Sequence, residues 1–459
     1  MKVYLETMGC QMNVLDSELV ASLLRRNGWE LTDEPREADV LLYNTCSVRQ
    51  HAEDKVHSRL GWACKRKAAG RRLIIGVLGC MAQRLGRELL RRHPGLDIIC
   101  SPGQLAHLPG MIRAASEGVQ VRLDPPRRVD ADRQALSALE AGRDPAHTHL
   151  PGQAYVRIMR GCDKFCAYCV VPVVRGRELS RPPADIIQEV RRLVDGGVTQ
   201  VTLLGQTVSS YRWREGGRCV GLAELLEMLD GVEGLRRLRF ITSYPGDFDE
   251  AILQAMRDLP RVCEYLHLPA QSGSDRVLRA MNRRYSRRQY DELIDKAREI
   301  VPGISLAGDF IVGFPGETDA DHAASIELIR RSGYKNSYIF KYSPRPGTPA
   351  ARRLPDDVPG EVKRRRHREL LAVQEEVSLR VHRGLVGRRV EVLVEGPSIR
   401  SDRQPVPAAA GQVQLAGRTR GDHIVVFDGP ADLAGRYVSV CITDATALAL
   451  IGRRADVEA

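Results

Sequence analysis

Short continuous apolar runs alternate with helically spaced segments over the first 118 residues. The runs cover residues 3–5, 38–43, 73–78 and 97–100. Continuous apolar runs are typical of parallel strands that are buried on both faces. The segment 15–27 has the spacing of a helix that crosses between two such strands. We therefore predict an N-terminal α/β domain over residues 1–118, with a parallel sheet and helices on its faces.

The same alternation returns, with more repeats, over residues 150–384. Its apolar runs cover residues 154–159, 200–204, 238–242, 265–268, 305–312 and 337–342. Six β/α units in series predict a partial (β/α) barrel, with its site at the carboxyl ends of the strands. The charged, proline-broken segment 119–149 between the two regions is interpreted as a linker with a short helix around 135–141.

The pattern changes again after residue 385. Short strands are predicted at residues 390–394, 412–415, 424–427 and 437–442, with Gly, Pro and Asp at the turns. This is typical of a small OB-like β-barrel, a fold often used on nucleic acids, over residues 385–452. Residues 453–459 are predicted to be a tail. The long basic helix 360–383 is interpreted as a solvated face.

The composition of the chain indicates which class of partner and which cellular compartment to expect. The chain has 459 residues and a formal net charge of +11, which favours a polyanionic partner such as nucleic acid. Its eleven cysteines are odd in number and widely spread, which argues against a disulfide framework. The N-terminus resembles no signal peptide, and no apolar run is long enough for a membrane span. We expect a cytoplasmic protein with reduced thiols and no membrane.

Three cysteines stand close together after the first strand of the predicted barrel. Cys162, Cys166 and Cys169 have the spacing C-x3-C-x2-C. An iron–sulfur cluster normally takes four thiolates, so a four-iron cluster held by three keeps one iron open to a small molecule. A zinc knuckle is the alternative, but zinc sites usually add a second C-x2-C pair or histidines at helical spacing.

Three further cysteines each follow a strand of the N-terminal domain: Cys10, Cys46 and Cys80. The carboxyl ends of parallel strands meet at one edge, so these thiols are expected to gather there. A second three-thiolate cluster is favoured over the alternative that each is a small buried hydrophobe. The neighbouring Gly9 and Gly79 are expected to let the backbone approach a bulky ligand.

Polar or glycine-rich segments also end the strands of the predicted barrel, and each offers hydrogen-bonding groups at the rim. The rim candidates are Gln206, Ser243, Gln271 and Asp309. His267 is interpreted as a structural histidine. The glycine-rich segment 308–316 lacks the dinucleotide-binding spacing, and the chain has no P-loop motif.

In combination these segments resemble the radical S-adenosylmethionine superfamily and, within it, the MiaB branch of the methylthiotransferases. The resemblance covers residues 1 to about 452 and rests on G-C-Q-M-N (9–13), N-T-C-S-V-R (44–49), G-C-M-A-Q-R (79–84), G-C-D-K-F-C (161–166), R-G-R-E (175–178), H-L-P-A-Q-S-G-S-D (267–275), M-N-R-R-Y (281–285) and Y-S-P-R-P-G-T (342–348). The last domain, with G-R-T (417–419) and V-V-F (425–427), resembles a TRAM domain.

The resemblance implies two 4Fe-4S clusters, one on each set of three cysteines, and no catalytic residue beyond these ligands. It implies S-adenosylmethionine as radical source and methyl donor, with contacts from Tyr168, Gln206, Ser243, Gln271 and Asp309. The implied reaction is methylthiolation of carbon 2 of N6-isopentenyladenosine next to the anticodon, with sulfur from the auxiliary cluster. The implied partners are a tRNA anticodon stem-loop and an electron donor such as a flavodoxin or ferredoxin.

Three alternatives are weighed against this function. One is methylthiolation of a threonylcarbamoyl-type tRNA adenosine. Another is methylthiolation of a ribosomal protein side chain, against which the segments 11–13 and 44–49 favour the RNA branch. The last is a non-catalytic iron–sulfur RNA-binding protein, which would not need a loop that leaves one iron open.

Overall fold

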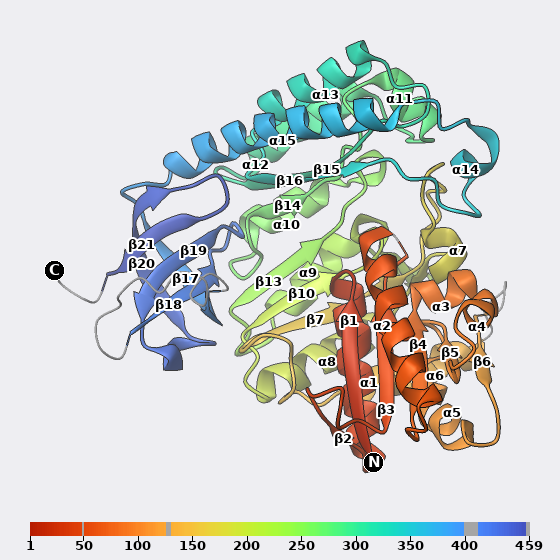
Figure 1. Cartoon of the computed structure of the whole chain (residues 1–459). Coiled ribbons are helices and arrows are strands. Elements are labelled where there is room, and N and C mark those ends of the chain that lie inside the picture. The colour runs from red at the N-terminus through yellow and green to blue at the C-terminus, as the bar shows by residue number, and fades with distance from the viewer. Residues whose placement is uncertain (48–49, 125–129, 399–411, 456–459) are drawn as a thin grey trace.

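The computed structural model describes residues 1–47, 50–124, 130–398 and 412–455. They form a parallel N-terminal sheet, a central arc of parallel strands with helices outside it, and a small closed β-barrel (Figure 1). The predicted fold class is therefore confirmed. Within the described residues, no helix is both long and apolar enough to cross a lipid bilayer.

The N-terminal sheet has six parallel strands in the order β2-β1-β3-β4-β5-β6. The four predicted strands are β1 (Lys2–Met8), β3 (Val40–Thr45), β4 (Ile74–Gly79) and β5 (Ile98–Cys100). The short edge strands β2 (Glu30–Leu31) and β6 (Gln120–Arg122) were not predicted, because neither has an apolar run. Since β6 pairs with β5, the sheet continues beyond the predicted boundary at residue 118.

Five helices accompany this sheet: α1 (Gln11–Arg26), α2 (Gln50–Ala68), α3 (Cys80–Leu85), α4 (Glu88–Arg92) and α5 (Leu108–Ala114). Helix α6 (Asp130–Ala141) lies in the predicted linker. Its Leu136 and Leu139 are buried in one hydrophobic cluster with Leu15 and Leu19 of α1. The segment is therefore packed against the N-terminal domain rather than loose, as its apolar spacing allows.

The central arc contains the six predicted strands, all parallel. They are β7 (Gln153–Arg157), β10 (Gln200–Leu204), β13 (Arg237–Ile241), β14 (Tyr265–His267), β15 (Ser305–Val312) and β16 (Asn336–Lys341). They form two three-stranded sheets, joined where Leu238 pairs with Val262 and where the Ser243 N–H donates to the His267 carbonyl at 3.1 Å. No ladder joins β7 to β16 in the described residues, so the barrel is partial, as predicted.

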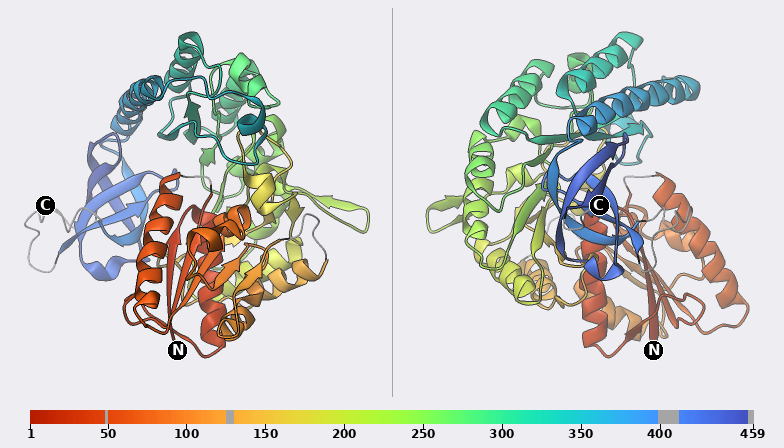
Figure 2. Two further views of the ribbon diagram at one scale, coloured as in Figure 1. Left: turned by 45° about the vertical axis from the view of Figure 1, so that its right-hand side comes forward. Right: turned by 90° about the vertical axis from the view of Figure 1, so that its left-hand side faces the viewer.

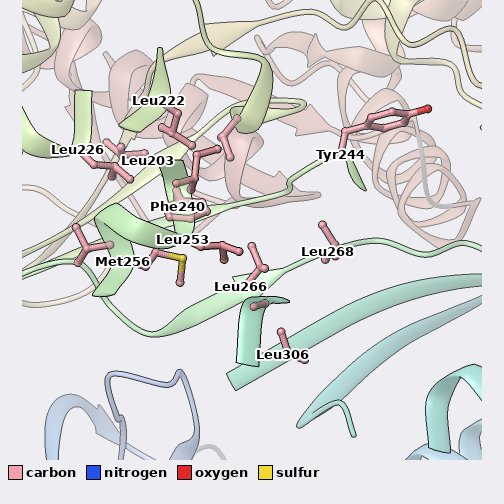
Figure 3. Close-up of a cluster of buried hydrophobic side chains, with 14 of the residues drawn as sticks. Leu203, Leu222, Leu226, Phe240, Tyr244, Leu253, Met256, Leu266, Leu268 and Leu306 are labelled. Carbon is pink, nitrogen blue, oxygen red and sulfur yellow. The ribbon is translucent and has the colours of Figure 1, made fainter. Parts of the chain in front are cut away.

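Helices cover the outer face of the arc. They are α8 (Pro183–Asp195), α9 (Leu222–Asp230), α10 (Glu250–Asp258), α12 (Arg287–Ile300), α13 (Asp319–Ser332) and α15 (Gly360–Arg383). Their apolar sides pack onto the strands (Figure 3). The strands contribute Leu203, Phe240, Leu266 and Leu306, and the helices contribute Leu226, Leu253 and Met256. Helix α15 buries Leu370 and Val377 there, so only part of its surface is the solvated basic face that was predicted.

The inner face of the arc is covered on one half only. On the β7–β10–β13 half, Tyr155, Leu204 and Ile241 pack into the cluster that contains helix α1. On the β14–β15–β16 half, the inner face has polar and aromatic side chains, and Tyr338 is 51% exposed. The N-terminal domain therefore fills one half of the arc and leaves the other accessible.

A hairpin projects from the arc (Figure 2). It consists of β11 (Trp213–Glu215) and β12 (Arg218–Val220), which pair in antiparallel register. It was not predicted, because its strands are short and half of their residues are charged.

The C-terminal barrel is closed, in the order β17-β18-β19-β21-β20. Its strands are β17 (Arg389–Pro397), β18 (Val413–Arg418), β19 (Ile424–Gly429), β20 (Tyr437–Ala445) and β21 (Leu450–Arg454). Four were predicted. The fifth was missed because only Leu450 and Ile451 are apolar before Gly and Arg residues, and it runs past the predicted end of the barrel at residue 452. Of the predicted tail, residues 456–459 lie outside the described residues.

The barrel docks on the amino ends of the arc strands. The Lys335 Nζ lies 2.7 Å from Asp422 Oδ2, and the Arg239 Nη1 lies 3.3 Å from Asp422 Oδ1. Asp422 is in the turn between β18 and β19 with a left-handed backbone, φ 61°. Burial raises the pKa of its carboxyl, but Lys335, Arg418 and Arg239 together lower it well below the ordinary value. The barrel is thus fixed at the end of the arc opposite the carboxyl ends of the strands.

Candidate functional site

The first three-cysteine set lies in a tight loop between β8 (Met159–Arg160) and α7 (Val171–Arg175). Gly161 opens the loop at φ 71°, and a Cβ there would lie 2.0 Å from the Arg177 carbonyl oxygen, so only glycine fits. A turn follows in which the Cys169 N–H donates to the Cys166 carbonyl at 3.0 Å. Burial, then the neighbouring Cys166, raises the pKa of the Cys169 thiol to about 12. The loop thus brings its three thiols within electrostatic reach of one another.

Two residues that the sequence analysis did not select contact these thiols. The Thr207 hydroxyl lies 3.4 Å from Cys162 Sγ, and Arg283 Nη1 donates to Cys166 Sγ at 3.5 Å. Arg283 is buried between the rings of Tyr244 and Tyr285, whose centroids lie 4.5 and 4.9 Å from its Cζ. A fixed positive charge beside a thiol favours the thiolate that binds metals. Arg283 was missed because the sequence alone does not show which arginines are buried.

Of the predicted rim residues, Gln206, Ser243 and Gln271 follow the ends of β10, β13 and β14, whereas Asp309 lies within β15. The Ser243 side chain is 2% exposed, and its hydroxyl has no hydrogen-bond partner among the described residues. The Gln271 N–H donates to the Asp309 carbonyl at 2.7 Å, and Asp309 Oδ1 lies 3.2 Å from His267 Nε2. Gln206 follows β10 after Gly205 and is half-buried. The rim therefore holds several polar groups, including a buried hydroxyl available to a ligand.

Backbone strain is concentrated around the same rim. Among the described residues, five other than glycine have positive φ, and four of them lie here: Phe165, Thr242, Gln271 and Asn282. Such conformations cost about 1–3 kcal/mol each and tend to occur at functional sites. Tyr168, the remaining predicted contact, instead packs its half-buried ring against two hydrophobic clusters, and burial raises the pKa of its hydroxyl.

The second three-cysteine set gathers at the carboxyl edge of the N-terminal sheet. Cys10 precedes α1, Cys46 follows β3, and Cys80 begins α3. A hydrogen bond from Cys46 lowers the pKa of the Cys10 thiol to about 6. Burial raises the pKa of the Cys80 thiol, although Arg175 Nε donates to Cys80 Sγ at 3.3 Å. The structure thus brings Cys10, Cys46 and Cys80 together at one edge of the sheet, as predicted.

The glycines beside these cysteines have a packing role that the sequence did not predict. A Cβ on Gly9 would lie 2.4 Å from Asn13 Oδ1, and one on Gly79 would lie 2.4 Å from Asn44 Oδ1. The two asparagines are buried and bonded, with Asn13 Nδ2 donating to Asn44 Oδ1 at 3.1 Å. The glycines thus make room for this asparagine pair, which braces the cysteine loops, and the expectation that they let the backbone approach a bulky ligand stays a prediction.

The two cysteine sets face each other across the contact of α3 with α7. Cys80 forms a small buried cluster with Val170 and Val174, and Val170 directly follows Cys169. Arg175, at the end of α7, reaches from the arc to Cys80 and also donates to Asp16 Oδ2 on α1 at 2.9 Å. One buried arginine therefore links the second cysteine set to the segment that follows the first.

A network of buried charges fixes this arrangement. Asp16 is fully buried and also accepts a hydrogen bond from Arg157 Nη1 at 2.9 Å. Arg157 Nε donates to Glu140 at 2.7 Å, and Arg181 Nε lies 2.8 Å from the same carboxylate. These residues come from α1, β7, α6 and the segment before α8, so the network joins the N-terminal domain to the arc.

A pocket of about 590 Å³ opens on the other side of the second cysteine set. It is lined by residues from both domains, among them Glu53, Arg84, Val173 and Arg345. Arg84 and Glu53 bond each other and also hold the hydroxyl of Ser47, next to Cys46. The pocket thus leads from the surface to the Cys46 loop.

Both sets suit an iron–sulfur cluster better than a single ion. All eleven cysteines are free thiols. Among the described residues, no three His, Cys, Asp or Glu side chains are placed to share one metal ion, as a zinc site would require. Soft thiolates grouped in threes are the donors that iron–sulfur clusters take, and a cluster spaces its ligands more widely than one ion does. Cysteines without clustered partners in the sequence, Cys219, Cys263 and Cys441, are expected by default to be packing residues; Cys263 is buried, but Cys219 and Cys441 are exposed, so this expectation is wrong for those two.

The chain matches two family models and many curated relatives. Residues 2–101 match the uncharacterized protein family UPF0004, and residues 156–329 match the radical SAM superfamily. A tRNA-2-methylthio-N(6)-dimethylallyladenosine synthase from Rhodopirellula baltica is 47% identical over 99% of this chain and 96% of its own length. The protein of that name from Syntrophotalea carbinolica is 42% identical over 98% and 99%.

Among solved structures, the radical S-adenosylmethionine methyltransferase TsrM from Kitasatospora setae is similar in fold. It has a TM-score of 0.53 and 14% sequence identity, and the match covers 76% of this chain and 75% of TsrM. At that identity the likeness concerns the fold alone. The full-length identity to the curated relatives is decisive: the chain belongs to the family of tRNA-2-methylthio-N(6)-dimethylallyladenosine synthases within the radical SAM superfamily.

Proposed function

We propose that this protein methylthiolates carbon 2 of N6-isopentenyladenosine next to the anticodon of tRNA. One observation of the structure carries the proposal: two sets of three thiols face each other across the contact of α3 with α7. The curated relatives with the same full-length organisation bear the name of that activity. Carbon 2 of adenine has an unactivated C–H bond, for which cofactor chemistry is required.

In this proposal Cys162, Cys166 and Cys169 hold one 4Fe-4S cluster, and the other three hold an auxiliary one: Cys10, Cys46 and Cys80. Three thiolates leave one iron of each cluster without a protein ligand. With S-adenosylmethionine bound, these groups supply radical generation, sulfur and the methyl group.

The chain's own residues bind and orient. Arg283 keeps a positive charge at Cys166 of the first set, and Arg175 keeps one at Cys80 of the second set. Ser243 offers its unpartnered hydroxyl to S-adenosylmethionine, with Gln206 and Gln271 beyond the adjoining strand ends and Asp309 on β15. We assign Tyr168 a packing role beside the bound molecule, because its ring is enclosed by hydrophobic clusters.

The further partners follow from this assignment. The C-terminal barrel is proposed to be a TRAM domain that contacts the tRNA anticodon stem-loop, and the net charge of +11 supports an RNA partner. An electron donor such as a flavodoxin or ferredoxin is required for radical generation. The proposed setting is the cytoplasm, where tRNA and reduced thiols are both available.

Mass spectrometry of tRNA nucleosides tests the function directly. Deletion of the gene should remove 2-methylthio-isopentenyladenosine and leave isopentenyladenosine in its place. The wild-type chain should restore it, as should the exposed-cysteine control Cys219→Ala, whereas Cys80→Ala should not. An unchanged nucleoside profile in the deletion strain would refute the proposal. Loss of a 2-methylthio-threonylcarbamoyl nucleoside instead, or of a ribosomal protein modification, would favour one of the alternative substrates.

A further inference from the structure

Two aromatic rings stand on the open half of the arc's inner face. Tyr338 and Phe340 are separated by one residue on β16, so both side chains leave the same face of the strand. Ile339, between them, points to the opposite face and is buried in the outer hydrophobic cluster. Tyr338 pairs in register with Asp309, which contacts His267. The two rings therefore share the inner face with predicted rim residues.

The pair is preorganised and accessible. The ring planes are within 17° of each other, and their centroids are 6.4 Å apart. Tyr338 is 51% exposed, one of the few large apolar side chains in the described residues with so much exposed surface. Strand β16 is the last strand of the arc, so nothing pairs with its outer edge in the described residues. Solvent thus reaches a ready-made aromatic surface inside the arc.

The surroundings favour a flat ligand that has negative charge. Lys341 is exposed but leaves the same face of β16 as Ile339, so the cation beside the rings is Arg418 of the barrel, which lies within electrostatic reach of Tyr338. Aromatic side chains on a sheet face with cations beside them are the usual platform for unpaired bases, because every base has a π-face and its backbone has phosphates. An aliphatic ligand would make no use of the parallel rings or of the positive charge of Arg418.

We propose that Tyr338 and Phe340 form a stacking platform for an unpaired base of the RNA substrate. This inference rests on the proposed function and deepens it. The adenine of S-adenosylmethionine has the same stacking chemistry, so the experiment must separate the two sources. The RNA base is favoured because Tyr338 lies within electrostatic reach of Arg418 on the barrel, which docks at the end of the arc opposite the first cysteine set.

Equilibrium binding of a fluorescein-labelled anticodon stem-loop with isopentenyladenosine tests the platform. The variants are Tyr338→Leu and Phe340→Leu, with Tyr338→Phe to retain the ring and Trp62→Leu as a matched exposed aromatic on α2. Tyr338→Leu and Phe340→Leu should each bind the RNA roughly tenfold more weakly in anaerobic anisotropy titrations. Tyr338→Phe and Trp62→Leu should bind like the wild type, and all four should keep wild-type iron content and affinity for S-adenosylmethionine.

A second measurement reads stacking itself. With 2-aminopurine placed at each unpaired loop position in turn, one position should be quenched on binding to the wild type and to Tyr338→Phe, but not to Tyr338→Leu. Wild-type RNA affinity in Tyr338→Leu and Phe340→Leu would overturn the inference. Weaker binding of S-adenosylmethionine by these two variants with unchanged RNA affinity would also overturn it. If the wild type forms product while these variants bind RNA normally, only the platform fails. If the wild type forms no 2-methylthio product, the proposed function itself fails.

Discussion

The two cysteine sets reach similar geometry by different routes. Cys162, Cys166 and Cys169 come from one loop whose shape depends on Gly161 and one tight turn. Cys10, Cys46 and Cys80 come from three strands and meet only because the sheet keeps its register. The first set has its arginine, Arg283, within the same domain, whereas the second takes Arg175 from the neighbouring one. The second site therefore depends on domain docking in a way that the first does not.

The largest effect is expected from removal of either set of thiols. Changing Cys162, Cys166 and Cys169 together to Ala should lower the iron of the anaerobically reconstituted protein from about eight to about four per chain. The corresponding triple change at the other set should do the same, because the two sites share no ligand. Iron analysis with electron paramagnetic resonance checks both, and Cys219→Ala is the control. Loss of all iron from one triple variant would contradict two independent sites.

The next largest effect should come from the docking network. Asp16→Ala leaves Arg157 and Arg175 buried without their shared carboxylate, so the free energy of unfolding should fall by about 3–5 kcal/mol. Urea titration of the apoprotein measures this. The exposed pair of Glu88 with Arg92 provides the control, since Glu88→Ala should change stability by less than about 1 kcal/mol.

The Asp16→Ala variant also tests whether iron binding at the second cysteine set depends on domain docking more than iron binding at the first. Without Asp16, Arg175 is no longer held at Cys80, so reconstitution should lose iron from the second set before the first. Asp16→Asn, which keeps the shape of the side chain, should show the same order if the full truncation folds poorly. Equal loss of iron from both cysteine sets would show that both sites depend on domain docking to the same extent.

A smaller effect is expected from the two arginines. Arg175→Gln and Arg283→Gln each remove one positive charge that donates to a thiol. Loss of positive charge beside a cluster disfavours its reduced form, so each variant should lower the reduction potential of its own cluster and leave the other unchanged. Redox titration followed by electron paramagnetic resonance measures both potentials. Lysine at either position should restore most of the difference, which a purely structural role would not predict.

Local pattern and long-range packing explain what the sequence could and could not predict. The six arc strands and the meeting of Cys10, Cys46 and Cys80 were predictable, because apolar periodicity marks parallel strands and strand ends share an edge. Arg175 and Arg283 were not, since an arginine becomes a buried partner only through contacts distant in sequence. The packing role of Gly79 was not predictable for the same reason: the atom that needs its space, Asn44 Oδ1, is on another strand.

The smallest effect concerns the barrel, whose docking involves neither cysteine set. The pKa of Asp422 is lower in the folded protein than its ordinary 3.8, mainly because Lys335, Arg418 and Arg239 outweigh its burial. A lowered carboxyl pKa stabilises the folded state above the ordinary value, and this stability is lost as the pH falls below it. Docking should therefore weaken by up to about 1.4 kcal/mol for each pH unit below 3.8.

Limited proteolysis of the apoprotein with pepsin, between pH 4.5 and 2.5, follows this docking through cleavage between the arc and the barrel. Asp422→Asn should be cleaved faster than the wild type at pH 4.5 and should lose this contribution to the pH dependence. The N-terminal domain should stay attached over the range in which the barrel first loosens, because Asp422 acts only at the far end of the arc. Release of both domains at one pH would mean that the interfaces yield together, and the independence of the two cysteine sites from the barrel would then have to be abandoned.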